Sequence, residues 1–319
     1  MNKLAITTAA ALTALAAVCA FGDWVYEGQW GTYGTGEGQF RHALGILADT
    51  NTYVYVADTN NHRVQYFREK GFPLGEWGEY GNGDGQFIQP RDLAEGRRGD
   101  IYVVDGANHR VQYFSGTGSF RGKWGTTGTG DGQFYEPYGI AVAADGNVYV
   151  CDTENHRIQY FNSTGSFLGK WGSKGGGSGE FEDPRGIAVA PNGNIYVADS
   201  FNYRIQYFTP TGSYLGAWGK RGKGEGEFNF PWSLAIWTTG DVYVSDLYNL
   251  RIQYFTSTGS YLGKIGGSGQ FNSPIGVSFG VTGERIYVSD AGNSRIQYYR
   301  CTNPAVAPAS LGRVKALFR

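Results

Sequence analysis

Short apolar runs separated by polar turns recur along the chain, and their pattern is that of β-strands. One unit, residues 179–219, contains the runs RGIAVA (185–190), NIYVAD (194–199), RIQYF (204–208) and SYLGAW (213–218). Runs of five or six residues rich in Ile, Val and Tyr, divided by Gly, Asn and Pro clusters, predict four strands. The second run is apolar at nearly every position, which predicts a strand buried on both faces. No run inside the unit has a helical period.

This unit occurs six times. The polar block DTNNHRVQYF (58–67) returns with small changes, and the aspartates that open the six copies stand at positions 58, 105, 152, 199, 246 and 290, four steps of 47 and one of 44. Such self-similarity is the signature of a repeat architecture. Six radially repeated units of four strands predict an all-β fold, a six-bladed β-propeller of four-stranded blades.

The two ends of the repeat region complement each other. The last unit stops after its third strand, RIQYYR (295–300), and the missing fourth strand has its match in WVYEGQWG (24–31). We therefore expect the N-terminal strand to complete blade 6, which closes the ring and leaves no open blade.

The residues outside the repeats predict export and a short tail. Residues 1–20 have a short n-region with Lys3, an apolar h-region and the small-residue ending Val18-Cys19-Ala20, a pattern typical of a signal peptide cut after Ala20. The alternative is a lipoprotein acylated at Cys19. We expect a propeller over 21–302, a Pro/Ala linker with a short basic tail over 303–319, and a periplasmic or extracellular location. The tail is either an export or docking tag or a frayed end.

Composition narrows the partners. The chain has 319 residues with a net charge of −1, and 17% of its residues are charged, so nucleic acid, which needs a basic face, is not an expected partner. No further run is long enough to span a bilayer. We also expect the protein to be a monomer. Cys151 stands where the other units have Ala, Val or Ser, which predicts a small buried residue.

The most regular polar residues are better explained as framework than as chemistry. A catalytic centre occurs at one asymmetric place in a protein. The Asp and Arg residues instead recur in every unit, so their six copies lie far from one another around the ring. We expect each Asp–Arg pair to satisfy a buried turn between the second and third strands, and the Asn of the block to hold the same turn. The five Trp of the outer strands predict blade packing. The Gly-rich loops precede strands and carry one carboxylate each, which argues against phosphate and calcium sites. The residues concerned are Asp58, Asp105, Asp152, Asp199, Asp246, Asp290, Arg63, Arg110, Arg157, Arg204, Arg251 and Arg295.

The units closely resemble the NHL repeat, and the six together resemble an NHL propeller of the secreted bacterial type. The resemblance rests on the start G-x-F-x-x-P-x-G-I-A and the block Y-V-x-D-x-x-N-x-R-I-Q, which recur in register over roughly residues 24–300. Unit 1 departs from the pattern with Ala43 in place of proline, and unit 2 with Asp92 in place of glycine. The resemblance implies a binding platform for proteins or RNA; a minority of such propellers are similar to peptidyl-amide lyases with a metal in the central channel.

Function is expected where the units differ, and three positions vary. Before the arginine stand His62, His109, His156, Tyr203, Leu250 and Ser294. After the proline stand Leu44, Arg91, Tyr138, Arg185, Trp232 and Ile275. Before the proline stand His42, Gln89, Glu136, Asp183, Phe230 and Ser273.

These positions divide the loop face into two sectors. Blades 1 to 3 are polar and carry histidines, whereas blades 4 and 5 are aromatic. We predict that this face binds a protein, peptide or glycan without catalysis or cofactor. The opposing interpretation is that the side chains only pack over neighbouring loops. The candidate binding residues are Arg91, Tyr138, Arg185, Phe201, Tyr203, Phe230, Trp232, Tyr248, His62, His109 and His156.

The alternative function is a metal-dependent lyase or hydrolase with its site in the central channel. The three histidines occupy equivalent places on consecutive blades, so they could share a metal only close to the axis. His42, near the start of an innermost strand, is the better candidate for zinc or calcium, but it has no second histidine at its level.

Overall fold

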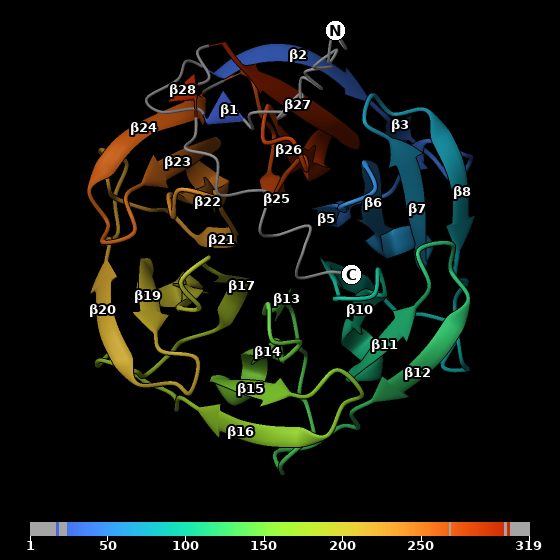
Figure 1. Cartoon of the computed structure of the whole chain (residues 1–319), viewed down its shortest axis with the longest axis horizontal. Coiled ribbons are helices and arrows are strands. Elements are labelled where there is room, and N and C mark those ends of the chain that lie inside the picture. Colours follow the sequence, from blue (N-terminus) through green and yellow to red (C-terminus); the bar gives the residue numbers. More distant parts are fainter. Residues whose placement is uncertain (1–16, 19–23, 268, 303–304, 307–319) are drawn as a thin grey trace, which may run out of the picture.

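The computed structural model describes residues 17–18, 24–267, 269–302 and 305–306, and within them the chain forms a ring of six four-stranded antiparallel sheets (Figure 1). The predicted signal peptide and the tail lie almost wholly outside these residues. The described residues form no α-helix, and none of their elements could span a membrane as a helix. The prediction of a six-bladed, all-β propeller is confirmed.

Each blade runs outward from the axis, first strand innermost. Blade 1 comprises β5 (Ala43–Ala48), β6 (Tyr53–Asp58), β7 (Arg63–Arg68) and β8 (Pro73–Trp77). Blade 2 comprises β9 (Pro90–Glu95), β10 (Ile101–Asp105), β11 (Arg110–Phe114) and β12 (Phe120–Trp124). Blade 3 comprises β13 (Ile140–Val142), β14 (Val148–Asp152), β15 (Arg157–Phe161) and β16 (Phe167–Trp171). Blade 4 comprises β17 (Pro184–Val189), β18 (Ile195–Asp199), β19 (Arg204–Phe208) and β20 (Tyr214–Trp218). Blade 5 comprises β21 (Pro231–Ile236), β22 (Val242–Asp246), β23 (Arg251–Phe255) and β24 (Tyr261–Gly266).

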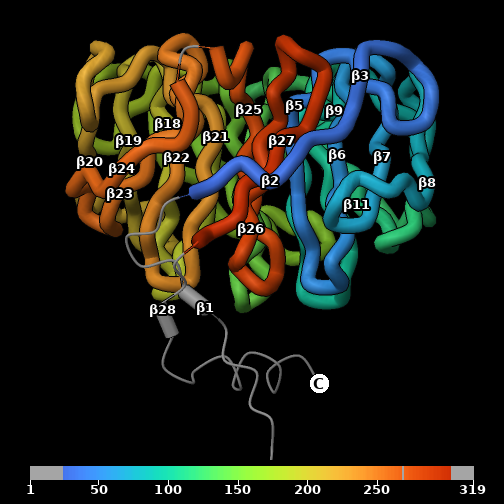
Figure 2. Tube along the Cα trace, turned by 90° about the horizontal axis from the view of Figure 1, so that it is seen from above, coloured from blue at the N-terminus to red at the C-terminus, as the bar shows by residue number. Residues whose placement is uncertain are grey.

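Blade 6 joins the two ends of the chain, as predicted. It comprises β25 (Pro274–Phe279), β26 (Arg285–Asp290), β27 (Arg295–Cys301) and, as outermost strand, β2 (Trp24–Trp30). β2 pairs antiparallel with β27, from Trp24 opposite Cys301 to Trp30 opposite Ile296. Figure 2 shows β2 lying across β27 on the side of the ring. The Arg285 side chain in β26 adds ion pairs to Glu27 of β2 and to Glu69 of blade 1.

Short elements complete the chain. Single-turn 3₁₀ helices link the second and third strands: η1 (Thr59–Asn61), η2 (Gly106–Asn108), η3 (Thr153–Asn155), η4 (Ser200–Asn202), η5 (Leu247–Asn249) and η6 (Ala291–Asn293). Two small pairs are β3 (Thr32–Tyr33) with β4 (Gln39–Phe40), and β1 (Ala17–Val18) with β28 (Ala305–Val306).

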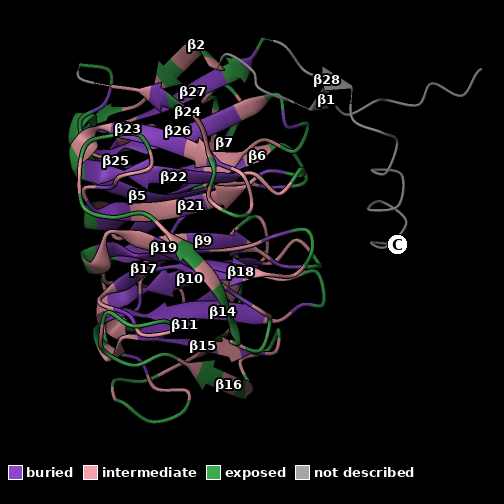
Figure 3. Cartoon of the chain, turned by 90° about the vertical axis from the view of Figure 1, so that its left-hand side faces the viewer, coloured by how far each residue is buried: buried purple, intermediate pink, exposed green. Residues whose placement is uncertain are grey.

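The hydrophobic core lies between neighbouring blades. The second strand of each blade is buried along its whole described length or nearly so, because both of its faces meet an adjacent sheet. Figure 3 shows the buried residues in the strands and the exposed ones mainly in the connecting loops. The tryptophans of five of the six outer strands pack on the next blade: the Trp77 ring centre, for example, lies 5.7 Å from that of Phe114. The outer strand of blade 5 has Ile265 in this place. The predicted blade-packing role of the tryptophans is confirmed, and Cys151 is a fully buried free thiol.

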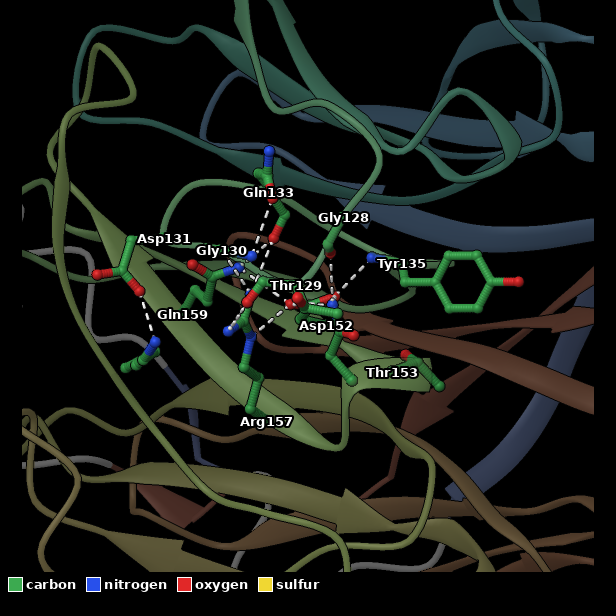
Figure 4. A network of polar contacts seen from close by, with 12 residues as sticks. Gly128, Thr129, Gly130, Asp131, Gln133, Tyr135, Asp152, Thr153, Arg157 and Gln159 are labelled. Atoms are coloured by element: carbon green, nitrogen blue, oxygen red, sulfur yellow. Dashed lines mark hydrogen bonds and ion pairs between the residues drawn. The ribbon is translucent and has the colours of Figure 1, made fainter.

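The Asp–Arg pairs form the framework that positions the loops (Figure 4). Asp152, fully buried, accepts hydrogen bonds from the Tyr135 amide, the Asn155 side chain, Arg157 Nε at 2.6 Å and Gln159 Nε2 at 3.0 Å. The Arg157 guanidinium also donates to the carbonyl oxygens of the Gly-rich loop at residues 129, 130 and 133. All six units repeat the Asp–Arg ion pair. The pair therefore fastens both the 3₁₀ turn and the loop that enters the blade, more than the single turn that was predicted.

Candidate functional site

One of the three variable positions converges on the axis of the ring. The residues after the proline, together with the residues that follow them, line a single narrow pocket where the innermost strands begin. It is lined by two residues of each blade. We call the first of each pair the wall residues, which are Leu44, Arg91, Tyr138, Arg185, Trp232 and Ile275, and the second the floor residues, which are Gly45, Asp92, Gly139, Gly186, Ser233 and Gly276. We call this pocket the axial pocket. Each blade contributes one wall residue, so the variation between units becomes the chemistry of one site.

Glycines on the floor bring the innermost strands together. A Cβ at Gly139 would collide with the Arg185 carbonyl oxygen, and one at Gly276 with the Leu44 carbonyl oxygen. A glycine in a strand commonly marks such a close approach of two backbones. The pocket is therefore narrow, and Asp92 and Ser233 are the two floor residues that carry a functional group.

Four of the predicted aromatic residues of blades 4 and 5 form one continuous cluster. The Phe230 ring lies 4.7 Å from Phe201, 5.5 Å from Tyr248 and 5.6 Å from Trp232. Trp232 in turn lies 5.5 Å from Tyr138 of blade 3. Phe201 and Tyr248 are 44% and 62% exposed, whereas Phe230 is buried. We call Phe201, Phe230, Trp232, Tyr248 and Tyr138 the aromatic cluster; it runs from the outer surface of this face into the axial pocket.

Arginines from blades 2 and 4 stack on this cluster. The Arg185 guanidinium lies 4.1 Å from the centre of the Trp232 ring and 4.6 Å from that of Tyr138. The Arg91 guanidinium also lies over the Tyr138 ring, 4.2 Å from its centre, and it forms an ion pair with Glu136. Arginine prefers aromatic faces because its planar cation is attracted by the ring quadrupole. The structure thus joins Arg91, Tyr138, Arg185 and Trp232 in one place, although the sequence had assigned the first two to a separate polar sector.

The three histidines of blades 1 to 3 are not brought together. Each ring accepts a hydrogen bond from a backbone N–H of the next blade: Gln89 to His62 Nδ1 at 3.2 Å, Glu136 to His109 Nδ1 at 3.0 Å and Asp183 to His156 Nδ1 at 3.2 Å. These histidines connect neighbouring blades. Burial lowers the pKa of His62, which keeps its ring in the neutral form that can accept the bond.

The remaining predicted residues lie at the margin of the site. Tyr203 lies under the Arg221 guanidinium, which is 5.2 Å from its ring centre, and it makes no ring contact with the aromatic cluster. His42 is exposed. In the described part of the chain, no three His, Cys, Asp or Glu side chains are grouped as metal ligands would be. The polar sector also carries exposed tyrosines that the sequence analysis did not single out: Tyr80 beside His62 and Tyr135 stacked on His109.

The other two variable positions share an unusual backbone conformation. The residues before the arginine have φ between 52° and 57°, and those before the proline have φ between 50° and 74°. This left-handed region is costly for residues other than glycine, by roughly 1 kcal/mol or more each. None of these twelve positions is a glycine. Such strain at side chains that face one end of the ring is typical of functional sites.

Comparison with known proteins agrees with the repeat pattern. The family model of the NHL repeat matches residues 134–161, 181–208, 228–255 and 271–299, one match in each of blades 3 to 6. Blades 3 to 6 are NHL repeats. It is also similar to Protein brain tumor of Drosophila melanogaster, with 40% identity over 47 residues, which cover 15% of this chain and only 4% of that protein.

Solved structures share the propeller fold. A streptogramin B lyase is 14% identical, with a TM-score of 0.61 and coverage of 88% of this chain and 98% of that chain. A gluconolactonase from Xanthomonas campestris is 15% identical, with a TM-score of 0.65 and the same coverage. A virginiamycin B lyase from Staphylococcus aureus, solved with quinupristin, is 14% identical, with a TM-score of 0.61 and coverage of 87% and 98%. At these identities the likeness concerns the fold alone.

The second repeat unit departs from the common pattern and places an acid on the floor of the axial pocket. Asp92 replaces a glycine, and its Oδ2 accepts the Ile140 amide at 3.1 Å. Burial raises the pKa of Asp92 from 3.8 to about 7. Asp92 is not among the candidate residues predicted from the sequence, although its departure from the repeat is visible there. A break in an otherwise regular repeat was the signal available.

Replacing Asp92 by asparagine is expected to raise stability at about pH 8 and to leave it nearly unchanged at about pH 4. A raised folded-state pKa means that the native protein binds the proton more tightly than the unfolded chain, so wild-type stability declines as the pH rises from 3.8 to about 7. Each pKa unit corresponds to about 1.4 kcal/mol, so the gain is at most about 4 kcal/mol. Urea unfolding across this pH range measures the effect. Asp131→Asn, on an exposed loop, is the control, and parallel pH profiles for Asp92→Asn and wild type would contradict the expectation.

Proposed function

We propose that this NHL propeller is an exported, non-enzymatic scaffold that captures a protein, peptide or glycan through the face that carries the aromatic cluster. The observation that carries the proposal is the continuity of that cluster. Exposed Phe201 and Tyr248 lead through Phe230 to Trp232 at the axial pocket. Large apolar side chains exposed together on a soluble protein are typical of binding surfaces, and Trp, Tyr and Arg are the residues that most often dominate binding energy.

The geometry of the face supports a binding role in a second way. Its loops are held rigidly, because every Asp–Arg pair fastens a 3₁₀ turn and a Gly-rich loop to the blade. A rigid surface loses little conformational entropy when it binds a partner. The propeller fold is widely used as a scaffold of this kind, and the left-handed backbone of the variable positions keeps their side chains at the same face in every blade.

Replacing Trp232 and Tyr248 together by alanine is expected to abolish capture of the ligand, and urea unfolding shows whether the variant is folded. Tyr248 is mostly exposed and Trp232 partly so, and loss of two aromatic contacts typically weakens binding by 2 kcal/mol or more, about 30-fold. Arrays of peptides and glycans probed with residues 21–319 identify the ligand, and titration gives the affinity.

Phe72→Ala is the matched control for this experiment. Phe72 is an exposed aromatic residue, 65% exposed, but it lies in the turn between β7 and β8 at the opposite end of the strands. It should bind as wild type does. Unaltered capture by the Trp232/Tyr248 variant would refute the proposed surface.

A lyase or hydrolase with its site in the channel is the second candidate function. The observation that favours it is Asp92, because a carboxyl group with a pKa of about 7 in a pocket is suited to proton transfer. Metal analysis of the purified protein separates the two functions. Stoichiometric zinc or calcium that is lost on His42→Ala would favour a metal-dependent enzyme over the scaffold.

A further inference from the structure

The Arg185 side chain differs from the other buried arginines of the described residues. The six framework arginines donate to an aspartate, and Arg91 donates to Glu136 and to the Pro137 carbonyl oxygen. Arg185 is only 14% exposed, yet its Nε is buried without a hydrogen-bond partner. The nearest carboxylate oxygen, on Asp183, is 3.9 Å from its Nη2, beyond hydrogen-bond distance. A guanidinium held in this way has unused donors.

The contacts of Arg185 leave those donors available. The guanidinium lies over Trp232 at 4.1 Å, Tyr138 at 4.6 Å and Phe230 at 5.1 Å. Stacking engages the faces of the planar cation, whereas its N–H groups lie in the plane. Two parallel N–H donors of a guanidinium match the two oxygens of a carboxylate, and such charge-assisted pairs are among the strongest hydrogen bonds in proteins.

The surroundings of Arg185 specify more than a negative charge. The Phe230 ring under the guanidinium leads to Phe201 and Tyr248, which are exposed and apolar. Asp183 beside Arg185 and Asp92 on the floor disfavour a doubly charged anion such as phosphate. A ligand for this pocket therefore combines one carboxylate with an apolar side chain.

We propose that the axial pocket binds the terminal carboxylate of a peptide or protein through Arg185, and that the last side chain of this ligand is apolar and lies on the exposed part of the aromatic cluster. The pocket itself is too small to hold a side chain besides the carboxylate, so the last side chain lies outside it. A sugar acid offers the carboxylate but has hydroxyl groups in place of the apolar side chain. The inference rests on the proposed function, because it assigns a ligand class to the same face.

Labelled hexapeptide pools test this assignment. Each pool has random residues except for one defined C-terminal residue, and each is made with a free carboxylate and with an amide. Fluorescence polarisation with residues 21–319 should show binding by the free-acid pools that end in Leu, Val or Phe. Amidation should weaken this binding at least tenfold. Equal binding of free-acid and amidated pools, or stronger binding of an oligogalacturonate than of any peptide pool, would overturn the inference.

Variants of Arg185 locate the interaction. Arg185→Gln should bind the free-acid pools no better than the amides. Arg185→Lys should recover binding only in part, because lysine keeps the positive charge but lacks the two parallel N–H donors of a guanidinium. Arg221→Gln is the control, since Arg221 also stacks on an aromatic ring, Tyr203, outside the pocket. Urea unfolding confirms that each variant is folded. If Trp232→Ala with Tyr248→Ala abolishes binding while Arg185→Gln and amidation do not matter, the scaffold function stands and the carboxylate site is refuted.

Discussion

Replacing Asp152 by alanine is expected to lower the free energy of unfolding by about 3–5 kcal/mol, the usual cost of breaking a buried ion pair. The carboxylate is fully buried, and its removal would leave Arg157, whose side chain is 9% exposed, charged and without its partner at 2.6 Å. The Tyr135 amide, Asn155 and Gln159 would lose their acceptor as well. Urea-induced unfolding followed by tryptophan fluorescence measures the loss.

Asp131→Ala is the matched control, because it removes an aspartate of the same unit that also forms an ion pair. Asp131 contacts Lys170 at 2.5 Å, but the two side chains are 54% and 44% exposed. Exposed pairs contribute at most about 1 kcal/mol. If both variants lose the same stability, the buried pair is not the framework that its geometry indicates.

Deleting residues 1–30 is expected to open the ring and to cost more stability than any single substitution considered above. Strand β27 would lose its outer partner β2, and an unpaired strand edge promotes association with other chains. Trp30, which packs on Phe67 of blade 1 and Tyr287 of blade 6, would go with it, a loss of about 3–5 kcal/mol by itself. The Trp24 hydrogen bond to Tyr243 of blade 5 would also be lost.

Light scattering after size exclusion and hydrogen exchange test this expectation. The deletion of residues 1–30 should produce oligomers or aggregates, and the amides of β26 and β27 should exchange faster. Deleting only residues 1–23 preserves β2 and should leave a monomer with normal protection. A stable monomer after the longer deletion would show that the ring does not depend on its closing strand.

The repeat pattern predicted the fold because each unit carries its own strand and turn signals. Blade number, the buried second strand, the closing strand and the Asp–Arg framework all follow from one unit and its period. The first strand of unit 4 begins at Pro184, one residue before the predicted start, and the others differ as little.

The site could be predicted only in part, because it depends on contacts between units. Arg91 and Arg185 occupy the same position of the repeat, yet one is satisfied by Glu136 of the following unit and the other has no hydrogen-bond acceptor at its Nε. His62 resembles a candidate ligand in the sequence, but its acceptor role depends on the Gln89 amide of the next blade. Neither outcome is visible in a single unit. The convergence of the wall residues likewise required the ring to be closed.

The left-handed backbone of the variable positions has a consequence for protein engineering. Twelve positions on one face, His42 and Ser294 among them, tolerate His, Gln, Glu, Asp, Tyr, Phe, Leu or Ser where glycine would fit with least strain. Since the strand pairing and the Asp–Arg framework lie elsewhere in each unit, those of the twelve positions that are neither buried nor bonded to the next blade can be randomised together as a library. New ligand specificities could then be selected on an unchanged ring, much as antibody loops vary on a constant sandwich.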